Sequence, residues 1–272
     1  MADGDARPPE GDWCGTPFLR FERRGPIAVC TVDRPDRRNA MTPAMYFGAR
    51  YAVDRVNRSD DLAALVFTGT GDVFIPGGDL SGDFDDDWAD LAGLLHQDNE
   101  PFEAIRNSAK PVVAAVNGIC QGGGLIMAML SDVAVASSTA TFRAPEIFRG
   151  IADTGYATYL PPQIGIPRAR DLLFTGRVLD ATTALEWGLI TRVVDPGTEL
   201  DEAIAVAQQI ARGAPGARNV VKREINRQYG RPDRMSMTAS LYGDECAEGY
   251  RAFKERRSPT WVPDELRRDG RL

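Results

Sequence analysis

The sequence has a single histidine, His96, and four cysteines that are far apart in the chain. It contains no HExxH motif and no CxxC pair, so the ligand spacings typical of zinc sites are absent and we expect no bound metal. It also lacks GxSxG and the GxxxxGKS or GxxxxGKT pattern, which argues against a serine hydrolase and a P-loop nucleotide hydrolase. Isolated cysteines favour reduced thiols in a cytoplasmic protein.

The sequence also has no excess of basic residues over acidic ones. The formal net charge is −7 and the isoelectric point is near 4.9, so we expect neither a nucleic acid nor a membrane as partner. Residues 111–131 carry no charge, but they include a proline, an asparagine and a group of glycines. This run predicts a buried strand followed by a buried helix rather than a membrane span. We expect residues 1–16 to be a disordered leader rather than a signal peptide.

Short apolar runs and helix-start signals make up most of the rest. The runs "FLRFERR" and "PIAVCTV" predict a β-hairpin, and Thr42 followed by Pro43 predicts the start of a helix. Further strands are expected at "LAALVFTGT", "VVAAVNG", "DVAVAS" and "ATFRAPE". From about Arg168 onward the pattern is mostly helical, with one strand at "LITRVV" and a last helical segment from about Met235 to Arg257. The pattern predicts strands with interleaved helices, then a helical C-terminal third.

Two glycine-rich segments, "FTGTGDVFIPGGDL" and "VNGICQGGGL", each follow a predicted strand. Glycine allows a ligand atom to approach backbone N–H groups closely. The second segment also places these groups at the start of a helix, where the helix dipole favours negative charge. Two such N–H groups converging on one oxygen would form an oxyanion hole for a developing enolate.

Seven segments follow one another along the chain in this order: "RPDRRNAM", "FTGTGDVFIPGGDL", "KPVVAAVNGICQGGGL", "SDVAVAS", "FRAPEIFRG", "LLFTGRVLDATTALEWGLITRVV" and "EGYRAFKERRSPTW". Together they resemble the enoyl-CoA hydratase/isomerase (crotonase) superfamily across residues 17–262. The resemblance implies an α/β fold, a spiral of ββα turns over residues 17–200, with a C-terminal helical region over 201–272 that trimerises and closes the acyl pocket. It also implies an acyl-CoA substrate, no cofactor beyond the coenzyme A of that substrate, and a homotrimer or dimer of trimers.

Carried over by position, the resemblance gives the oxyanion hole to the N–H groups of Gly78 and Gly123. The resemblance assigns the binding of coenzyme A to four residues, which are Arg37, Arg38, Ala40 and Arg256. Arginine suits phosphate recognition because its guanidinium is planar and always charged. The alternative for Arg37 and Arg38 is that they are ordinary surface cations.

The carboxylate pattern departs from that of the two-carboxylate hydratases. The position of their first glutamate is Ile126 here, and the position of the second is Glu146. We expect Glu146 to be the catalytic base, although a glutamate taken alone is most often a solvated carboxylate. Because one carboxylate suffices to move a proton between two carbons, the sequence favours double-bond isomerisation by Glu146.

Asp153 has two interpretations of equal weight. It falls near a catalytic aspartate of some relatives, including dienoyl-CoA isomerases and naphthoyl-CoA synthases, and it also suits the N-cap of a helix beginning in "ADTGYATYL". Tyr156 is either a pocket wall or ordinary packing. The alternatives to double-bond isomerisation by Glu146 are hydration or dienoyl-CoA isomerisation by Glu146 with Asp153, and a non-catalytic acyl-CoA-binding relative. We expect the acidic run at 83–90 to be solvated and His96 to be a surface or packing residue.

Overall fold

The computed structural model describes residues 14–80 and 101–267, which fold into two sheets and a set of helices. The expectations for most of the leader, for the acidic run at 83–90 and for His96 lie outside the described residues. The larger sheet has six strands in the order β1-β2-β3-β5-β7-β10. These strands are β1 Leu19–Arg24, β2 Ile27–Val32, β3 Ala64–Gly69, β5 Val112–Val116, β7 Val133–Ser137 and β10 Arg192–Val194.

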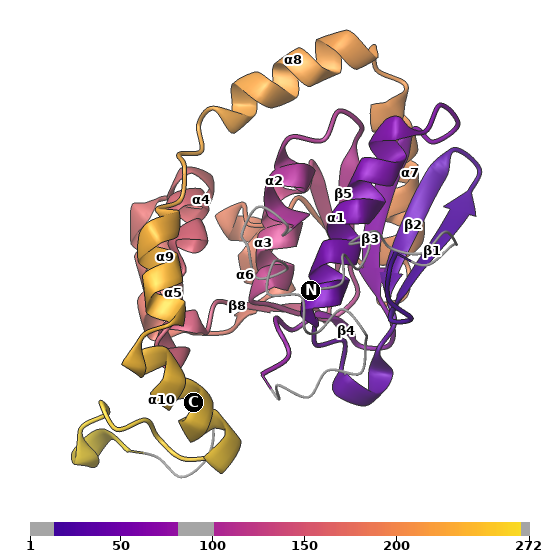
Figure 1. Ribbon diagram of the computed structural model, residues 1–272. Coiled ribbons are helices and arrows are strands. Elements are labelled where there is room, and N and C mark those ends of the chain that lie inside the picture. The colour runs from indigo at the N-terminus through magenta and orange to yellow at the C-terminus, as the bar shows by residue number, and fades with distance from the viewer. Residues whose placement is uncertain (1–13, 81–100, 268–272) are drawn as a thin grey trace, which may run out of the picture.

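The strand β1 pairs with β2 as the predicted antiparallel hairpin, and the other neighbours in the larger sheet are parallel. A smaller sheet has the order β4-β6-β8-β9 and consists of β4 Val73–Ile75, β6 Ile119–Gln121, β8 Thr141–Arg143 and β9 Leu179–Asp180. Along the chain, β3, β5 and β7 are each followed by a strand of the smaller sheet and then by a helix. This repeat is the spiral of ββα turns that the family resemblance implies (Figure 1).

The helices follow the predicted signals closely. Thr42 caps the first one, since its hydroxyl accepts a hydrogen bond from the Met45 N–H at 3.3 Å, and Pro43 opens it. The helices are α1 Pro43–Arg58, α2 Pro101–Arg106, α3 Gly123–Leu130, α4 Thr154–Ile164, α5 Ile166–Thr175, α6 Ala181–Trp187, α7 Glu199–Ala211, α8 Pro215–Asn226, α9 Arg234–Leu241 and α10 Asp244–Glu255, with the short 3-10 turns η1 Pro35–Arg37, η4 Glu146–Arg149 and η5 Asp264–Leu266.

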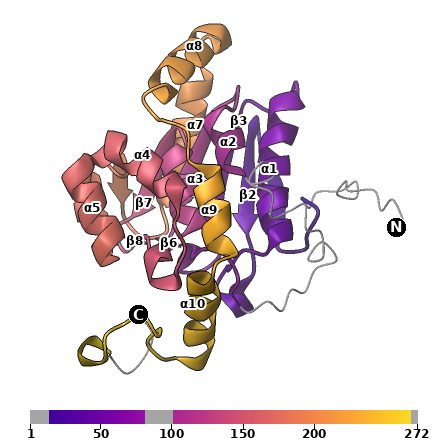
Figure 2. The same ribbon diagram turned by 60° about the vertical axis from the view of Figure 1, so that its left-hand side comes forward.

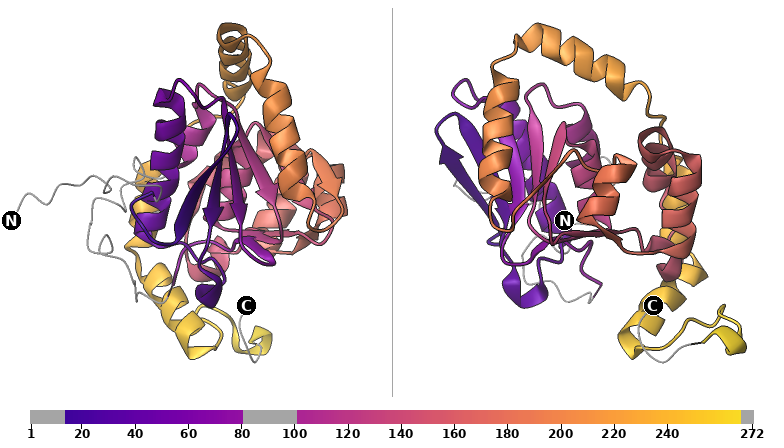
Figure 3. Two further views of the ribbon diagram at one scale, coloured as in Figure 1. Left: turned by 90° about the vertical axis from the view of Figure 1, so that its right-hand side faces the viewer. Right: turned by 180° about the vertical axis from the view of Figure 1, so that it is seen from behind.

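Both faces of the larger sheet are covered at its centre, where β2, β3 and β5 are buried along almost their whole length and are mostly apolar. Val29, Val66 and Val113 pack against α7 through Ala203 and Val206. The opposite face packs against α1 and the helices beside it (Figure 3). The expected boundary after residue 200 falls within the first turn of α7, a helix that packs on this sheet.

The helices that follow α7 lead away from the larger sheet toward α4 and η4. In Figure 1, α8 crosses from α7 to the side of the molecule that holds α4 and α9. From there α9 packs on α4, and α10 packs on η4 (Figure 2). The helical segment expected from about Met235 to Arg257 is two helices, because the chain is extended at Gly243, and glycine weakens a helix interior.

Residues 111–131 fold as β5, β6 and α3, the buried strand and helix that the sequence predicts. Within residues 14–80 and 101–267, no helix combines the length and the apolar character that crossing a membrane requires. The four cysteines, Cys14, Cys30, Cys120 and Cys246, are buried and form no disulfide.

Candidate active site

The two glycine-rich segments touch at Gly77 and Gly122. A Cβ on Gly122 would lie 2.8 Å from the Cα of Gly77, which is closer than real Cβ contacts. Both residues have a positive φ, 109° for Gly77 and 55° for Gly122, a conformation that suits glycine. The glycines therefore allow two backbone segments from the ends of β4 and β6 to pack directly against each other.

Gly78 has its backbone fixed on either side. The carbonyl of Gly77 accepts a hydrogen bond from the Met41 N–H at 2.9 Å, and the Asp79 N–H donates to the carbonyl of Met41 at 2.8 Å. Gly78 itself is exposed, and its N–H donates to no backbone acceptor among the described residues. The segment thus holds one N–H in a fixed position and leaves it open.

Gly123 is the first residue of α3, so its N–H is one of the donors that a helix leaves unpaired at its start. The carbonyl of the preceding Gly122 accepts hydrogen bonds from the Leu125 N–H at 2.9 Å and the Ile126 N–H at 3.3 Å. The fully buried Tyr156 donates a third from its hydroxyl. Gly78 and Gly123 each carry a backbone N–H on one of two segments that are in contact, and an oxyanion hole requires two such donors.

Glu146 begins η4, shortly after β8, and its carboxyl group lies beside Gly122. Its Oε1 atom is 3.2 Å from the position that a Cβ on Gly122 would take. Its Oε2 atom is buried and has no hydrogen-bond partner among the described residues. Burial, with the charge of Asp153 as the next largest cause, raises the pKa of Glu146 to about 8. A carboxyl group with this pKa is able to give or take a proton near neutral pH.

Asp153 is the N-cap of α4 and accepts a hydrogen bond from the Tyr156 N–H at 3.1 Å. It also lines a cavity, together with Ile126. Burial raises the pKa of Asp153 to about 6, while backbone hydrogen bonds from Tyr156 and Gly155 act in the opposite direction. The structure therefore gives Asp153 the capping role and places its carboxylate beside the cavity as well.

The cavity, whose empty space of about 390 Å³ includes open solvent, lies between α2, α3, α4 and the start of α9. It is lined by Phe102, Glu103, Ile126, Asp153, Gly155, Tyr159, Pro232, Arg234 and Met237. Most of these positions are apolar, as in ordinary ligand sites, but charged side chains enter it as well. Its position beside Asp153 makes it the candidate pocket for the acyl group.

Arg37 and Arg38 are exposed, at the end of η1 and directly after it. The backbone around them is fixed by a residue that the sequence analysis missed, the buried Arg34. Arg34 donates to the carbonyl of Ala40 at 3.0 Å and to the Asp79 carboxylate at 2.7 Å. This ion pair ties the arginine-rich loop to the residue next to Gly78. Its two members stand in the quoted segments "RPDRRNAM" and "FTGTGDVFIPGGDL", but their pairing depends on the fold.

Arg256 is exposed at the C-terminal end of α10, where it has a φ of 55°. Figures 1 and 3 show α10 apart from η1, the turn that follows β2. A single chain therefore does not gather Arg256 with Arg37 and Arg38. Within the described chain there is also no group of three or more histidine, cysteine, aspartate or glutamate residues placed to hold a metal ion.

Comparison with known proteins identifies the family to which the chain is similar. The model of the family described as enoyl-CoA hydratase/isomerase matches residues 22–264. A curated relative, mevalonyl-coenzyme A hydratase of Aspergillus fumigatus, is 32% identical over 255 residues, covering 88% of this chain and 93% of its own. A solved carnitinyl-CoA dehydratase from Mycobacterium avium is 35% identical with a TM-score of 0.75, covering 90% of this chain and 99% of its own.

A solved monofunctional enoyl CoA isomerase from M. smegmatis is similar too, with 29% identity, a TM-score of 0.65, and coverage of 77% of this chain and 92% of its own. The matches thus include proteins named for water removal or addition and one named for isomerisation. The family match covers the glycine segments, Glu146 and Asp153 alike. The chain belongs to the enoyl-CoA hydratase/isomerase family, within the crotonase superfamily, and its substrates are acyl-CoA thioesters.

Proposed function

We propose that this protein adds water reversibly to a 2-enoyl-CoA thioester, with Asp153 and Glu146 as its acid–base pair. The observation that carries the proposal is the position of Asp153 close enough to Glu146 for its charge to act on it: burial and this charge raise the pKa of Glu146 to about 8, and burial raises the pKa of Asp153 to about 6. Pairs of titratable groups with separated pKa values are typical of acid–base catalysis. The names of the curated mevalonyl-CoA hydratase and the solved carnitinyl-CoA dehydratase support the same reaction class.

The thioester oxygen would lie between the N–H groups of Gly78 and Gly123. These donors stabilise the negative charge that develops on this oxygen when water attacks C3 of the enoyl group. The helix dipole of α3 acts in the same direction, because Gly123 is at its positive end. The enolate is thereby held without a charged side chain at the oxygen.

The two carboxyl groups take different roles at neutral pH. Asp153, with a pKa of about 6, is ionised and removes a proton from the attacking water. Glu146, with a pKa of about 8, is protonated and delivers its proton to C2. Dehydration runs through the same steps in reverse. Asp153 thus supplies the second carboxylate that Ile126 does not.

Isomerisation, which the sequence alone favours, is the second candidate function. The observation in its favour is Ile126, an apolar side chain lining the cavity at the position where two-carboxylate relatives have glutamate. In this alternative Asp153 acts only as the cap of α4. Glu146 then removes a proton from one carbon and returns it to another without adding water.

The test incubates the protein with 2-enoyl-, 3-enoyl- and dienoyl-CoA thioesters in ¹⁸O-labelled water, with products identified by mass and NMR. Hydration predicts a 3-hydroxyacyl-CoA product that carries the label. A shift of the double bond without incorporation of oxygen would replace hydration by isomerisation. Tight binding of all the thioesters without any product would identify a non-catalytic acyl-CoA-binding relative.

We also propose that Arg37, Arg38, Ala40 and Arg256 bind coenzyme A within a homotrimer or dimer of trimers. The separation of α10 from η1 in one chain supports binding by Arg256 across a subunit contact. Exposed apolar side chains on α8, namely Val220, Val221 and Ile225, support such a contact because an isolated chain leaves them in water. Light scattering measures the number of chains directly.

A further inference from the structure

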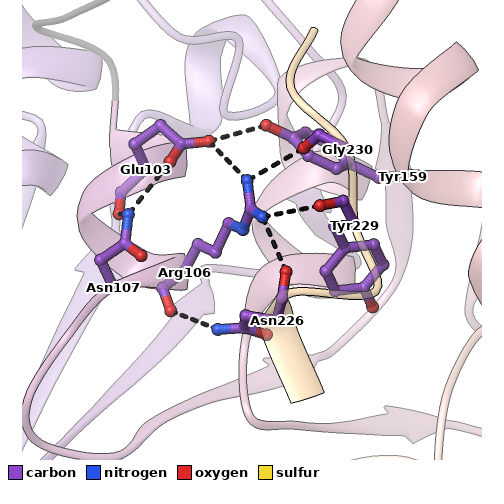
Figure 4. Close-up of polar contacts among 7 residues, drawn as sticks. All are labelled: Glu103, Arg106, Asn107, Tyr159, Asn226, Tyr229 and Gly230. Carbon is purple, nitrogen blue, oxygen red and sulfur yellow. Dashed lines mark hydrogen bonds and ion pairs between the residues drawn. The ribbon is translucent and has the colours of Figure 1, made fainter. Parts of the chain in front are cut away.

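A polar cluster stands at one side of the acyl cavity, centred on Glu103 of α2 (Figure 4). The Oε1 atom of Glu103 accepts hydrogen bonds from the Tyr159 hydroxyl at 2.8 Å and from Arg106 Nη1 at 3.3 Å. Its Oε2 atom accepts one from Asn107 Nδ2 at 3.0 Å. Glu103 and Tyr159, but not Arg106 or Asn107, line the cavity.

Arg106 fixes this cluster to the C-terminal region. Its guanidinium donates to the carbonyls of Asn226 at 2.7 Å, Tyr229 at 3.1 Å and Gly230 at 3.3 Å, and lies 5.7 Å from the ring centres of Tyr159 and Tyr229. Figure 4 shows the guanidinium between α2 and this segment. The segment leads directly into Pro232, Arg234 and Met237, which form a wall of the cavity. Arg106 is therefore a positioning residue.

The two residues that reach the cavity retain acceptors but no donor. The single hydroxyl proton of Tyr159 is directed to Glu103, and burial raises the pKa of Tyr159 above its ordinary value, so the proton stays. The Tyr159 oxygen keeps lone pairs, and the Glu103 carboxylate has about four acceptor sites for its three donors. A ligand group that donates a hydrogen bond matches this arrangement.

The charges around the cavity favour a ligand group that donates a hydrogen bond and is itself uncharged. The carboxylates of Glu103 and Asp153 disfavour an anionic acyl tail in the cavity. A cationic tail finds no unpaired charge at Glu103, because this carboxylate is already paired with Arg106. An alkyl tail in contact with Glu103 and Tyr159 would remove water from their acceptors without replacing its hydrogen bonds. A hydroxyl group satisfies every one of these conditions.

We propose that Glu103 and Tyr159 determine substrate specificity by selecting an acyl group that carries a hydroxyl at its far end. This inference rests on the proposed function in one respect, that the cavity holds the acyl part of a coenzyme A thioester. It does not depend on whether the reaction is hydration or isomerisation.

The test measures the dissociation constants of saturated thioesters by calorimetry on freshly prepared compounds, which separates binding from turnover because they lack the double bond on which either proposed reaction acts. Each hydroxyacyl-CoA is compared with the thioester that has a methyl in place of the hydroxyl: 4-hydroxybutanoyl with pentanoyl, 5-hydroxypentanoyl with hexanoyl, and 6-hydroxyhexanoyl with heptanoyl. We expect one hydroxylated compound to bind about 10- to 100-fold more tightly than its partner, as for a hydrogen bond to a charged group.

Tyr159→Phe and Glu103→Gln should each reduce this preference for the hydroxyl several-fold. Tyr242→Phe, a change at a tyrosine that is 80% exposed and outside the cavity, should preserve it. Equal binding within all three pairs, a preference unchanged in both variants, or tighter binding of 5-aminopentanoyl-CoA than of its hydroxyl analogue overturns the inference. If no thioester binds, the proposed function fails and this inference fails with it. Failure of the hydroxyl preference alone leaves the proposed function in place.

Discussion

The hydroxyl of Tyr156 donates a hydrogen bond to the carbonyl oxygen of Gly122, with 2.5 Å between the oxygens. Tyr156 is in the first turn of α4, and its own N–H donates to the Asp153 carboxylate. One residue thus contacts both a candidate catalytic acid and the peptide that precedes Gly123. The side chain of Tyr156 makes the contact beside the candidate oxyanion hole, and its backbone N–H makes the contact with the candidate acid.

Tyr156→Phe should therefore lower kcat without raising KM in proportion. The substitution keeps the ring but leaves the Gly122 carbonyl with one partner fewer, so the Gly123 N–H is held less firmly. We expect a loss of roughly 10- to 100-fold, the scale on which small misplacements affect catalysis. Steady-state kinetics measures it, with Tyr242→Phe as the matched control. Parent-like kcat in a folded Tyr156→Phe variant would contradict the assigned role.

Substitution of the two acids separates the proposed reactions. Glu146→Gln should keep the fold and thioester binding but lose roughly two to four orders of magnitude in kcat. Asp153→Asn keeps a good N-cap for α4, so a loss of activity in this variant reports on chemistry rather than folding. A severe loss in both variants supports hydration by two acids, whereas a mild loss in Asp153→Asn supports isomerisation. Near-full activity of Glu146→Gln would exclude both mechanisms.

The pH dependence of kcat/KM should be bell-shaped. Activity rises as Asp153 loses its proton near pH 6, and it falls as Glu146 loses its proton near pH 8, because the pair needs one proton in total. The two apparent pKa values belong to the pair, since the groups interact. In Asp153→Asn only the alkaline limb should remain. A profile that stays flat from pH 5 to pH 9 in the folded parent protein is the contrary result.

Gly78 allows a matched test of the oxyanion hole. A Cβ there would meet only the Met41 carbonyl oxygen, at 3.9 Å, so Gly78→Ala should be close to parent activity. Gly78→Pro removes the N–H donor and should lower kcat about 10²- to 10³-fold. Circular dichroism and coenzyme A binding check that the proline variant is folded. Equal activity of the alanine and proline variants would remove Gly78 from the oxyanion hole.

The elements with local signals were predictable from the sequence. The helix α1 begins at Pro43 because Thr42 supplies the cap, and both are adjacent in the chain. The strands were found because their side chains are apolar on both faces. The break between α9 and α10 was missed, since Gly243 is a weak signal within an otherwise helical composition.

The site was predictable only in part. The order of motifs points to Glu146 and the glycines, but the coupling of Glu146 with Asp153 depends on how η4 and α4 pack. The Glu103–Tyr159 hydrogen bond joins residues that are 56 positions apart, and neither residue stands in a recognisable pattern. Long-range pairs of this kind are set by the tertiary structure, so no local rule reveals them.

The buried carboxyl of Glu146 also has a thermodynamic consequence for the whole molecule. Its pKa is about 8 in the folded chain, against an ordinary value of 4.5, so between these pH values the folded state holds a proton that the unfolded state has released. The free energy of unfolding therefore decreases as the pH rises through this interval. Glu146→Gln cannot ionise and should gain stability over the parent at pH 8 relative to pH 5 in urea unfolding. The same burial that prepares this group for proton transfer makes the native state sensitive to alkali.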